Sequence, residues 1–98
     1  MASSASIAEL TPPPGIEDAS RALEIARIWI VDKNLRVRLA GDMWEDPALW
    51  GILLADLARH VSNAYANQGF DKSNALRRIK EAFEAEWGHP TDEAAELV

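Results

Sequence analysis

Asp56 and His60 are the two side chains whose types and spacing come closest to an acid–base site. Four residues apart on a helix, they would lie one turn apart, and the carboxylate could orient the imidazole. A general base also needs a nucleophile or substrate within reach. Ser62 would project from another side of the helix, and no glycine elbow surrounds it. We interpret His60 as a boundary histidine, predict no catalytic residue, and keep an Asp56–His60 enzyme as a third hypothesis.

Three carboxylates, Asp42, Glu45 and Asp46, precede a long apolar repeat and could suggest a cation site. Helix capping and the helix dipole explain them more simply. The spacing is not that of an EF-hand loop, and the chain has no cysteine for a thiolate metal site or a disulfide. We predict neither a metal site nor a cofactor.

A tryptophan among arginines is the set that points most clearly to binding. An indole among guanidiniums can form cation–π contacts, and both residue types are enriched at interface hot spots. The set could mediate self-association, be covered by the N-terminal arm, or bind a small anionic or planar ligand. The candidate interface or ligand face comprises Ile25, Arg27, Trp29, Val31, Arg36 and Arg38.

Residues 22–40 must position that face, and their pattern predicts a β-hairpin. β-Branched and aromatic residues fill 25–31, and apolar and basic residues alternate over 35–39. The cluster Asp32-Lys33-Asn34 is typical of a turn. A competing interpretation places a helical turn between Asp18 and about Arg27, where good helix formers gather.

The length of the turn decides which side chains share a face. A two-residue loop at Lys33-Asn34 would place Ile28 and Ile30 opposite Leu39 and Val37. A three-residue loop would instead bury Arg27 on the apolar face, so we prefer the shorter loop. The arginines would then share the other face with Trp29.

Two amphipathic helices should follow the hairpin. Asp46 can cap the first, Pro47 suits its first position, and Gly69 followed by Phe70 can close it. Asp71-Lys72-Ser73-Asn74 starts the second, and Gly88 and Pro90 end it. The apolar positions are Trp50, Leu53, Leu54, Leu57, Val61, Ala64 and Tyr65 in the first, and Ala75, Leu76, Ile79, Ala82, Phe83 and Trp87 in the second.

The predicted fold is therefore α+β, a β-hairpin followed by two amphipathic helices packed on one sheet face (β-β-α-α). At 98 residues the chain has room for one domain, over 19–90. We assign 1–18 to a flexible proline-rich arm and 91–98 to an acidic tail.

The net charge and the hydropathy limit the classes of partner that this protein could bind. A net charge of −6 argues against broad contact with nucleic acid or anionic lipid. The start shows no signal sequence, and no apolar run is long enough for a membrane span. We expect a cytoplasmic protein that binds neither nucleic acid nor membrane.

The blocks WEDPALWGILLADLARH and EAEWGHPTD, within residues 22–94, resemble a small bacterial family of domains of unknown function. The resemblance implies no activity, ligand or catalytic residue. From the residues themselves, we expect a non-enzymatic interaction module that forms a homodimer through its hairpin. The alternative is a binding protein for a small anionic or planar ligand on the Trp29/Arg face.

Overall fold

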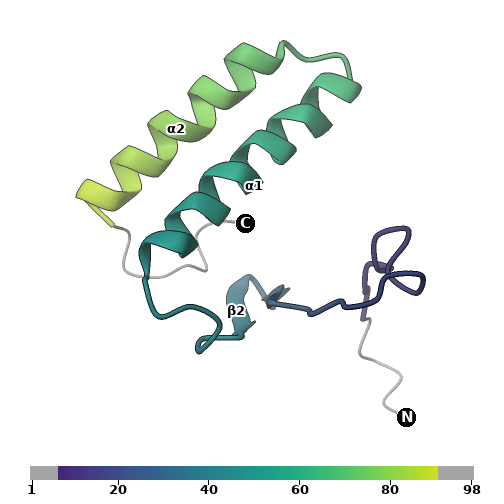
Figure 1. Cartoon of the computed structure of the whole chain (residues 1–98). Coiled ribbons are helices and arrows are strands. Elements are labelled where there is room, and N and C mark those ends of the chain that lie inside the picture. Colours follow the sequence, from purple (N-terminus) through teal and green to yellow (C-terminus); the bar gives the residue numbers. More distant parts are fainter. Residues whose placement is uncertain (1–6, 91–98) are drawn as a thin grey trace.

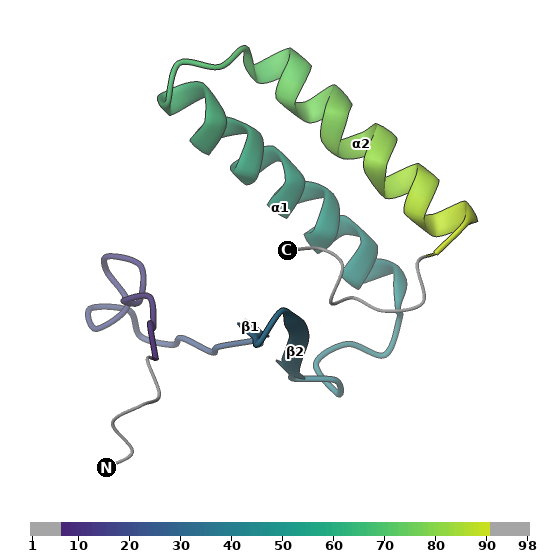
Figure 2. The same cartoon turned by 180° about the vertical axis from the view of Figure 1, so that it is seen from behind.

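The computed structural model describes residues 7–90, which form a hairpin followed by two helices (Figures 1 and 2). The strands are β1 (Ala26–Val31) and β2 (Asn34–Leu39), and the helices are α1 (Ala48–Asn67) and α2 (Lys72–Gly88). This order confirms the predicted β-β-α-α class. The first six residues of the predicted arm and the acidic tail at 91–98 lie outside the described residues.

The hairpin turn lies one residue earlier than predicted, at Asp32-Lys33. Both residues have positive φ, 51° and 72°. Such values are typical of a type I′ turn, whose twist matches that of the flanking strands. Ile28 therefore pairs with Val37, and Ile30 with Leu35, so the predicted pairs were wrong by two residues. A shift of two preserves the alternation, and both faces keep their predicted members.

The described part of the N-terminal segment, residues 7–25, contains turns and bends but no helix. The N–H groups of Asp18 and Ala19 donate to the carbonyls of Gly15 and Ile16, each at 3.2 Å. The helical alternative for Asp18 to about Arg27 was therefore wrong, and a strand occupies the chain from Ala26. Good local helix formers do not suffice here, because short isolated helices are marginal in water.

Both ends of α1 follow the sequence prediction. The Asp46 carboxylate accepts a hydrogen bond from the Ala48 N–H at 2.9 Å. At the other end, Gly69 adopts φ 99°, and the Phe70 N–H donates to the Tyr65 carbonyl at 3.1 Å. The Phe70 and Tyr65 rings then meet edge to face, 5.6 Å apart. The helix is thus ended by a left-handed glycine with an apolar contact across it.

α2 begins at a similar cap, since the Asp71 carboxylate accepts from the Ser73 N–H at 3.2 Å. Figures 1 and 2 show α2 running back antiparallel beside α1. Ser62 of α1 is fully buried, and its hydroxyl donates to the Ala58 carbonyl at 3.0 Å. Ala58 and Ala66, one turn to either side, are partly buried. We infer that this row of small residues faces α2, because small side chains let helix axes approach closely.

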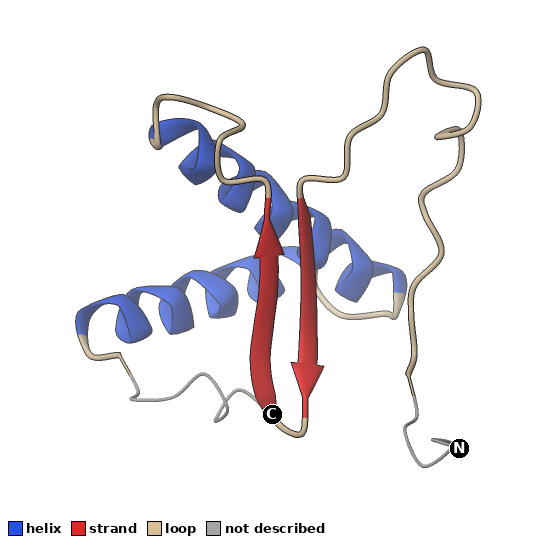
Figure 3. Ribbon diagram, turned by 90° about the horizontal axis from the view of Figure 1, so that it is seen from below, coloured by secondary structure: helices blue, strands red, loops and turns tan. Residues whose placement is uncertain are grey.

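The two helices do not pack over the hairpin, which differs from the predicted arrangement. β1 and β2 contact each other, α1 and α2 contact each other, and the two pairs make little contact. Figure 1 shows the hairpin below the helix pair, and Figure 3 shows its two strands side by side in front of the helices. No hydrophobic side chain within residues 7–90 is buried. The radius of gyration is 16.2 Å, against about 13 Å for a compact chain of this length. Residues 7–90 therefore lack the apolar interior that the sequence pattern predicts.

Candidate functional site

The hairpin brings the six predicted site residues to one side of the sheet. Arg27 lies opposite Arg38, Trp29 opposite Arg36, and Val31 opposite Asn34. The Ala40 N–H donates to the Ile25 carbonyl at 2.9 Å, so the ladder continues one step and Ile25 joins the same alternation. We call this surface, comprising Ile25, Arg27, Trp29, Val31, Arg36 and Arg38, the Trp/Arg face.

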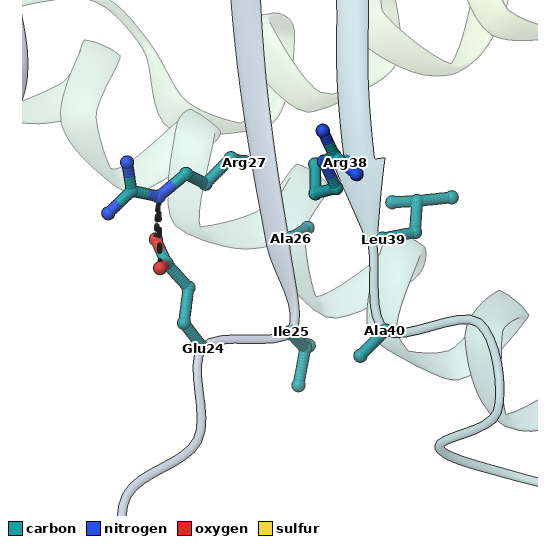
Figure 4. Close-up of a pocket in the computed structure, with 7 residues that line it drawn as sticks. All are labelled: Glu24, Ile25, Ala26, Arg27, Arg38, Leu39 and Ala40. Atoms are coloured by element: carbon teal, nitrogen blue, oxygen red, sulfur yellow. Dashed lines mark hydrogen bonds and ion pairs between the residues drawn. The ribbon is translucent and has the colours of Figure 1, made fainter.

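Arg27 is the most constrained cation of the Trp/Arg face. Its Nε donates to both carboxylate oxygens of Glu24, at 3.0 and 2.9 Å, and one terminal nitrogen lies 3.0 Å from Glu9 (Figure 4 draws the Glu24 pair). The hydrogen bonds and the charge of Glu24, with a smaller contribution from Glu9, raise the pKa of Arg27 above its ordinary value. Both ion pairs are half exposed to solvent, so they add little to stability.

The other members differ in exposure. Trp29 is partly buried, whereas Arg36 and Arg38 are exposed. One terminal nitrogen of Arg36 donates to the Leu35 carbonyl at 3.2 Å, a contact with the neighbouring residue on its own strand. The face therefore presents a partly covered indole beside guanidiniums that reach into solvent.

A shallow hollow of about 260 Å³ lies at the open end of the hairpin (Figure 4). Small-molecule sites usually enclose about 300–1,000 Å³, so this hollow falls below that range. Two guanidiniums and one carboxylate line it, and the carboxylate already pairs with Arg27. Its lining is Glu24, Ile25, Ala26, Arg27, Arg38, Leu39 and Ala40.

The opposite face of the hairpin is apolar and also uncovered, which the sequence interpretation missed. Ile28, Ile30, Val37 and Leu39 are 59, 48, 51 and 52 % exposed. The alternation of the strands identifies this face correctly, but only the tertiary structure shows that the helices leave it open. A two-stranded sheet with no covered face is marginally stable in water.

A second exposed aromatic surface lies at the end of α2, and a partly buried tryptophan pair lies near the start of α1. The rings of Trp44 and Trp50 pack edge to face, with their centroids 5.2 Å apart. The ring of Phe83 stacks on that of Trp87, with 5.7 Å between centroids. Trp87 is 79 % exposed, although its position in the repeat predicts an inward side chain. A hollow of about 420 Å³ borders Phe83 and Trp87. Large exposed apolar patches are characteristic of interaction sites.

The carboxylates and the histidine weighed for catalysis or metal binding lie at the surface. The Asp56 carboxylate lies 3.2 Å from the Arg59 guanidinium, and His60 is exposed. Asp46 caps α1, as described above. Within residues 7–90, no three acidic or histidine side chains gather in a way that could hold a metal ion.

The fold is that of a small α+β domain whose hairpin leaves its apolar face open to solvent. The chain belongs to the family described as Domain of unknown function (DUF5076), which matches residues 9–91. This match begins within the segment assigned above to the arm. The family membership confirms the resemblance inferred from the sequence.

One similar solved structure is a candidate pyruvate dehydrogenase from the photosynthetic bacterium Rhodopseudomonas palustrus CGA009. It is 38 % identical, with a TM-score of 0.68, and the match covers 89 % of this chain and 90 % of that one. The comparison with curated proteins gave no match. Among the described residues, no helix combines the length and apolarity needed to cross a membrane.

Proposed function

We propose that this protein is a non-enzymatic interaction module that self-associates into a homodimer through its hairpin. The observation that carries the proposal is that no hydrophobic side chain within residues 7–90 is buried. Burial of apolar surface is the main favourable contribution to folding, at about 25 cal/mol per Å². A chain with this apolar content is stabilised by covering that surface, and a second copy is the simplest cover.

The hairpin supports this role in two ways. Its apolar face is about half exposed, and its Trp/Arg face carries the residue types enriched at binding hot spots. Both long edges of the two-stranded sheet are also unpaired within residues 7–90. Exposed edges favour pairing with another chain.

Size-exclusion chromatography with light scattering tests the proposal on the full chain. We expect twice the monomer mass of 10.8 kDa at high micromolar concentration, with dissociation on dilution. A protein that stays at 10.8 kDa throughout this range would contradict the proposal. A titration of mass against concentration then gives the dissociation constant needed for comparing variants.

The alternative is a binding protein for a small anionic or planar ligand. The hollow at the end of the hairpin favours it, because Arg27 and Arg38 line that hollow near the indole-bearing face. We expect an anionic aromatic carboxylate to quench tryptophan fluorescence, and Trp29→Ala or Arg38→Ala to abolish the quenching. Arg59→Ala, on α1, is the matched control and should retain it. Equal quenching in all three variants would argue against this site.

A further inference from the structure

The outer edge of β1 has a defined set of free backbone groups. Because the Ala40 N–H bonds to the Ile25 carbonyl, the odd-numbered residues 25–31 direct their backbone groups toward β2. Ala26, Ile28 and Ile30 therefore direct theirs toward the outer edge. Within residues 7–90 the sheet has two strands, and no backbone hydrogen bond from residues 7–25 reaches this edge.

We propose that β1 pairs antiparallel with β1 of a second copy, centred on Ile28. The result is a four-stranded sheet of order β2-β1-β1-β2. This inference rests on the proposed self-association and specifies its edge and register. A twofold axis requires a strand to pair antiparallel with itself, and such closed symmetry is the commonest in homo-oligomers.

In the registers centred on residues 36–38, the charges disfavour self-pairing of β2. If β2 paired with itself around Val37, Arg36 would lie opposite the partner's Arg38. By symmetry, Arg38 would also lie opposite the partner's Arg36. Centring on either arginine would place it opposite its own copy. Like charges directly opposite each other destabilise a sheet. β1 carries Arg27 as its single charge, so its self-pairing avoids this repulsion.

Centring on Ile28 also creates favourable contacts. Arg27 would lie opposite the partner's Trp29, twice over, at positions without ladder hydrogen bonds, where side chains approach most closely. A guanidinium beside an indole face gains cation–π energy. Centring on Trp29 would instead oppose Arg27 to the partner's Val31. The chosen register also joins the two apolar hairpin faces into one continuous face, and an independently stable sheet needs three or more strands with such a face.

Single-cysteine cross-linking tests the edge directly, because the chain has no cysteine of its own. In Ile28→Cys the two sulfurs flank the twofold axis, with Cα atoms about 5.5 Å apart, which suits a disulfide. Val37→Cys is the matched control, on the same face but at the outer edge of β2. We expect oxidised Ile28→Cys to become mostly covalent dimer and Val37→Cys to remain uncross-linked. The reverse pattern would overturn the edge, and faster cross-linking of Trp29→Cys would overturn the register.

Proline substitutions give a second measurement that needs no oxidation. Ile28→Pro and Val37→Pro each remove an outward N–H and one apolar side chain from the same face, and edge strands tolerate proline at such positions. We expect Ile28→Pro to raise the dimer dissociation constant at least about tenfold more than Val37→Pro does, because it removes two intersubunit hydrogen bonds. Equal effects with a dimeric parent would overturn this edge while leaving self-association intact. A monomeric parent would instead contradict the proposed function itself.

Discussion

Trp29 and Arg36 lie directly opposite each other in the hairpin, so an indole and a guanidinium share one side of the sheet. If this side mediates association, Trp29→Ala should cost about 2 kcal/mol of binding, which raises the dissociation constant about 30-fold. Light scattering over a dilution series measures it. Trp87→Ala, on α2 and 79 % exposed, is the control and should have a smaller effect. A larger effect of Trp87→Ala would move the interface to the aromatic surface of the helices.

Gly69 and Gly51 predict opposite effects of the same substitution. A Cβ at either position would meet no atom within 4 Å, so the backbone alone decides. Gly69 has φ 99°, where alanine is strained, and Gly69→Ala should destabilise the protein by about 1 kcal/mol. Gly51 lies within α1, and Gly51→Ala should stabilise it by about 0.5–1 kcal/mol. Urea unfolding followed by circular dichroism measures both, and changes of the same sign would contradict this account.

The Asp46 cap predicts a measurable loss of helix stability. Asp46→Ala leaves the Ala48 N–H without its side-chain acceptor, and such substitutions cost about 1 kcal/mol. Asp42→Ala removes the same charge from the loop before the cap and is the control, with a change within about 0.5 kcal/mol. Thermal unfolding of both variants decides the matter. Similar losses in the two variants would assign the effect to charge instead of capping.

Glu81 predicts an acid-sensitive contribution from α2. Hydrogen bonds from Arg78 and Arg77, at 2.9 and 2.8 Å, hold the pKa of Glu81 below its ordinary value. A carboxylate with a lowered folded-state pKa contributes stability above its unfolded pKa, near about 4.3, and loses it as pH falls through the folded pKa. The difference in stability between the parent and Glu81→Gln should therefore be present at neutral pH and vanish in acid.

Because Glu81 is about half exposed, this difference should be small and should shrink in high salt. Glu84→Gln is the matched control, because it removes the same charge from the same helix and leaves the ion pairs of Arg77 and Arg78 with Glu81 in place. Unfolding midpoints between pH 7 and pH 3 provide the measurement. An unchanged difference between the parent and Glu81→Gln across this range would refute the assignment.

Features set by neighbouring residues were predicted well. These features are the Asp46 cap, the left-handed Gly69 that ends α1, and the two faces of the hairpin. Each depends on residues that are close together in the sequence. The prediction placed the turn one residue too late, whereas the two residues with positive φ are Asp32 and Lys33. Asp32 and Asn34 both tolerate the left-handed conformation, so the sequence did not decide which two residues of this cluster form the turn. The six residues of the Trp/Arg face could be grouped from alternation alone.

The sequence by itself determined the elements, their ends and the polarity of each face, because backbone hydrogen bonding and alternation act over a few residues. Only the tertiary structure decided how those faces are used. It buried Ser62 on α1 and left the larger apolar side chains of the hairpin exposed. Packing depends on contacts between segments that are distant in the sequence. The periodicity of apolar residues identifies which face of an element should be buried, but it does not identify the element that packs against that face.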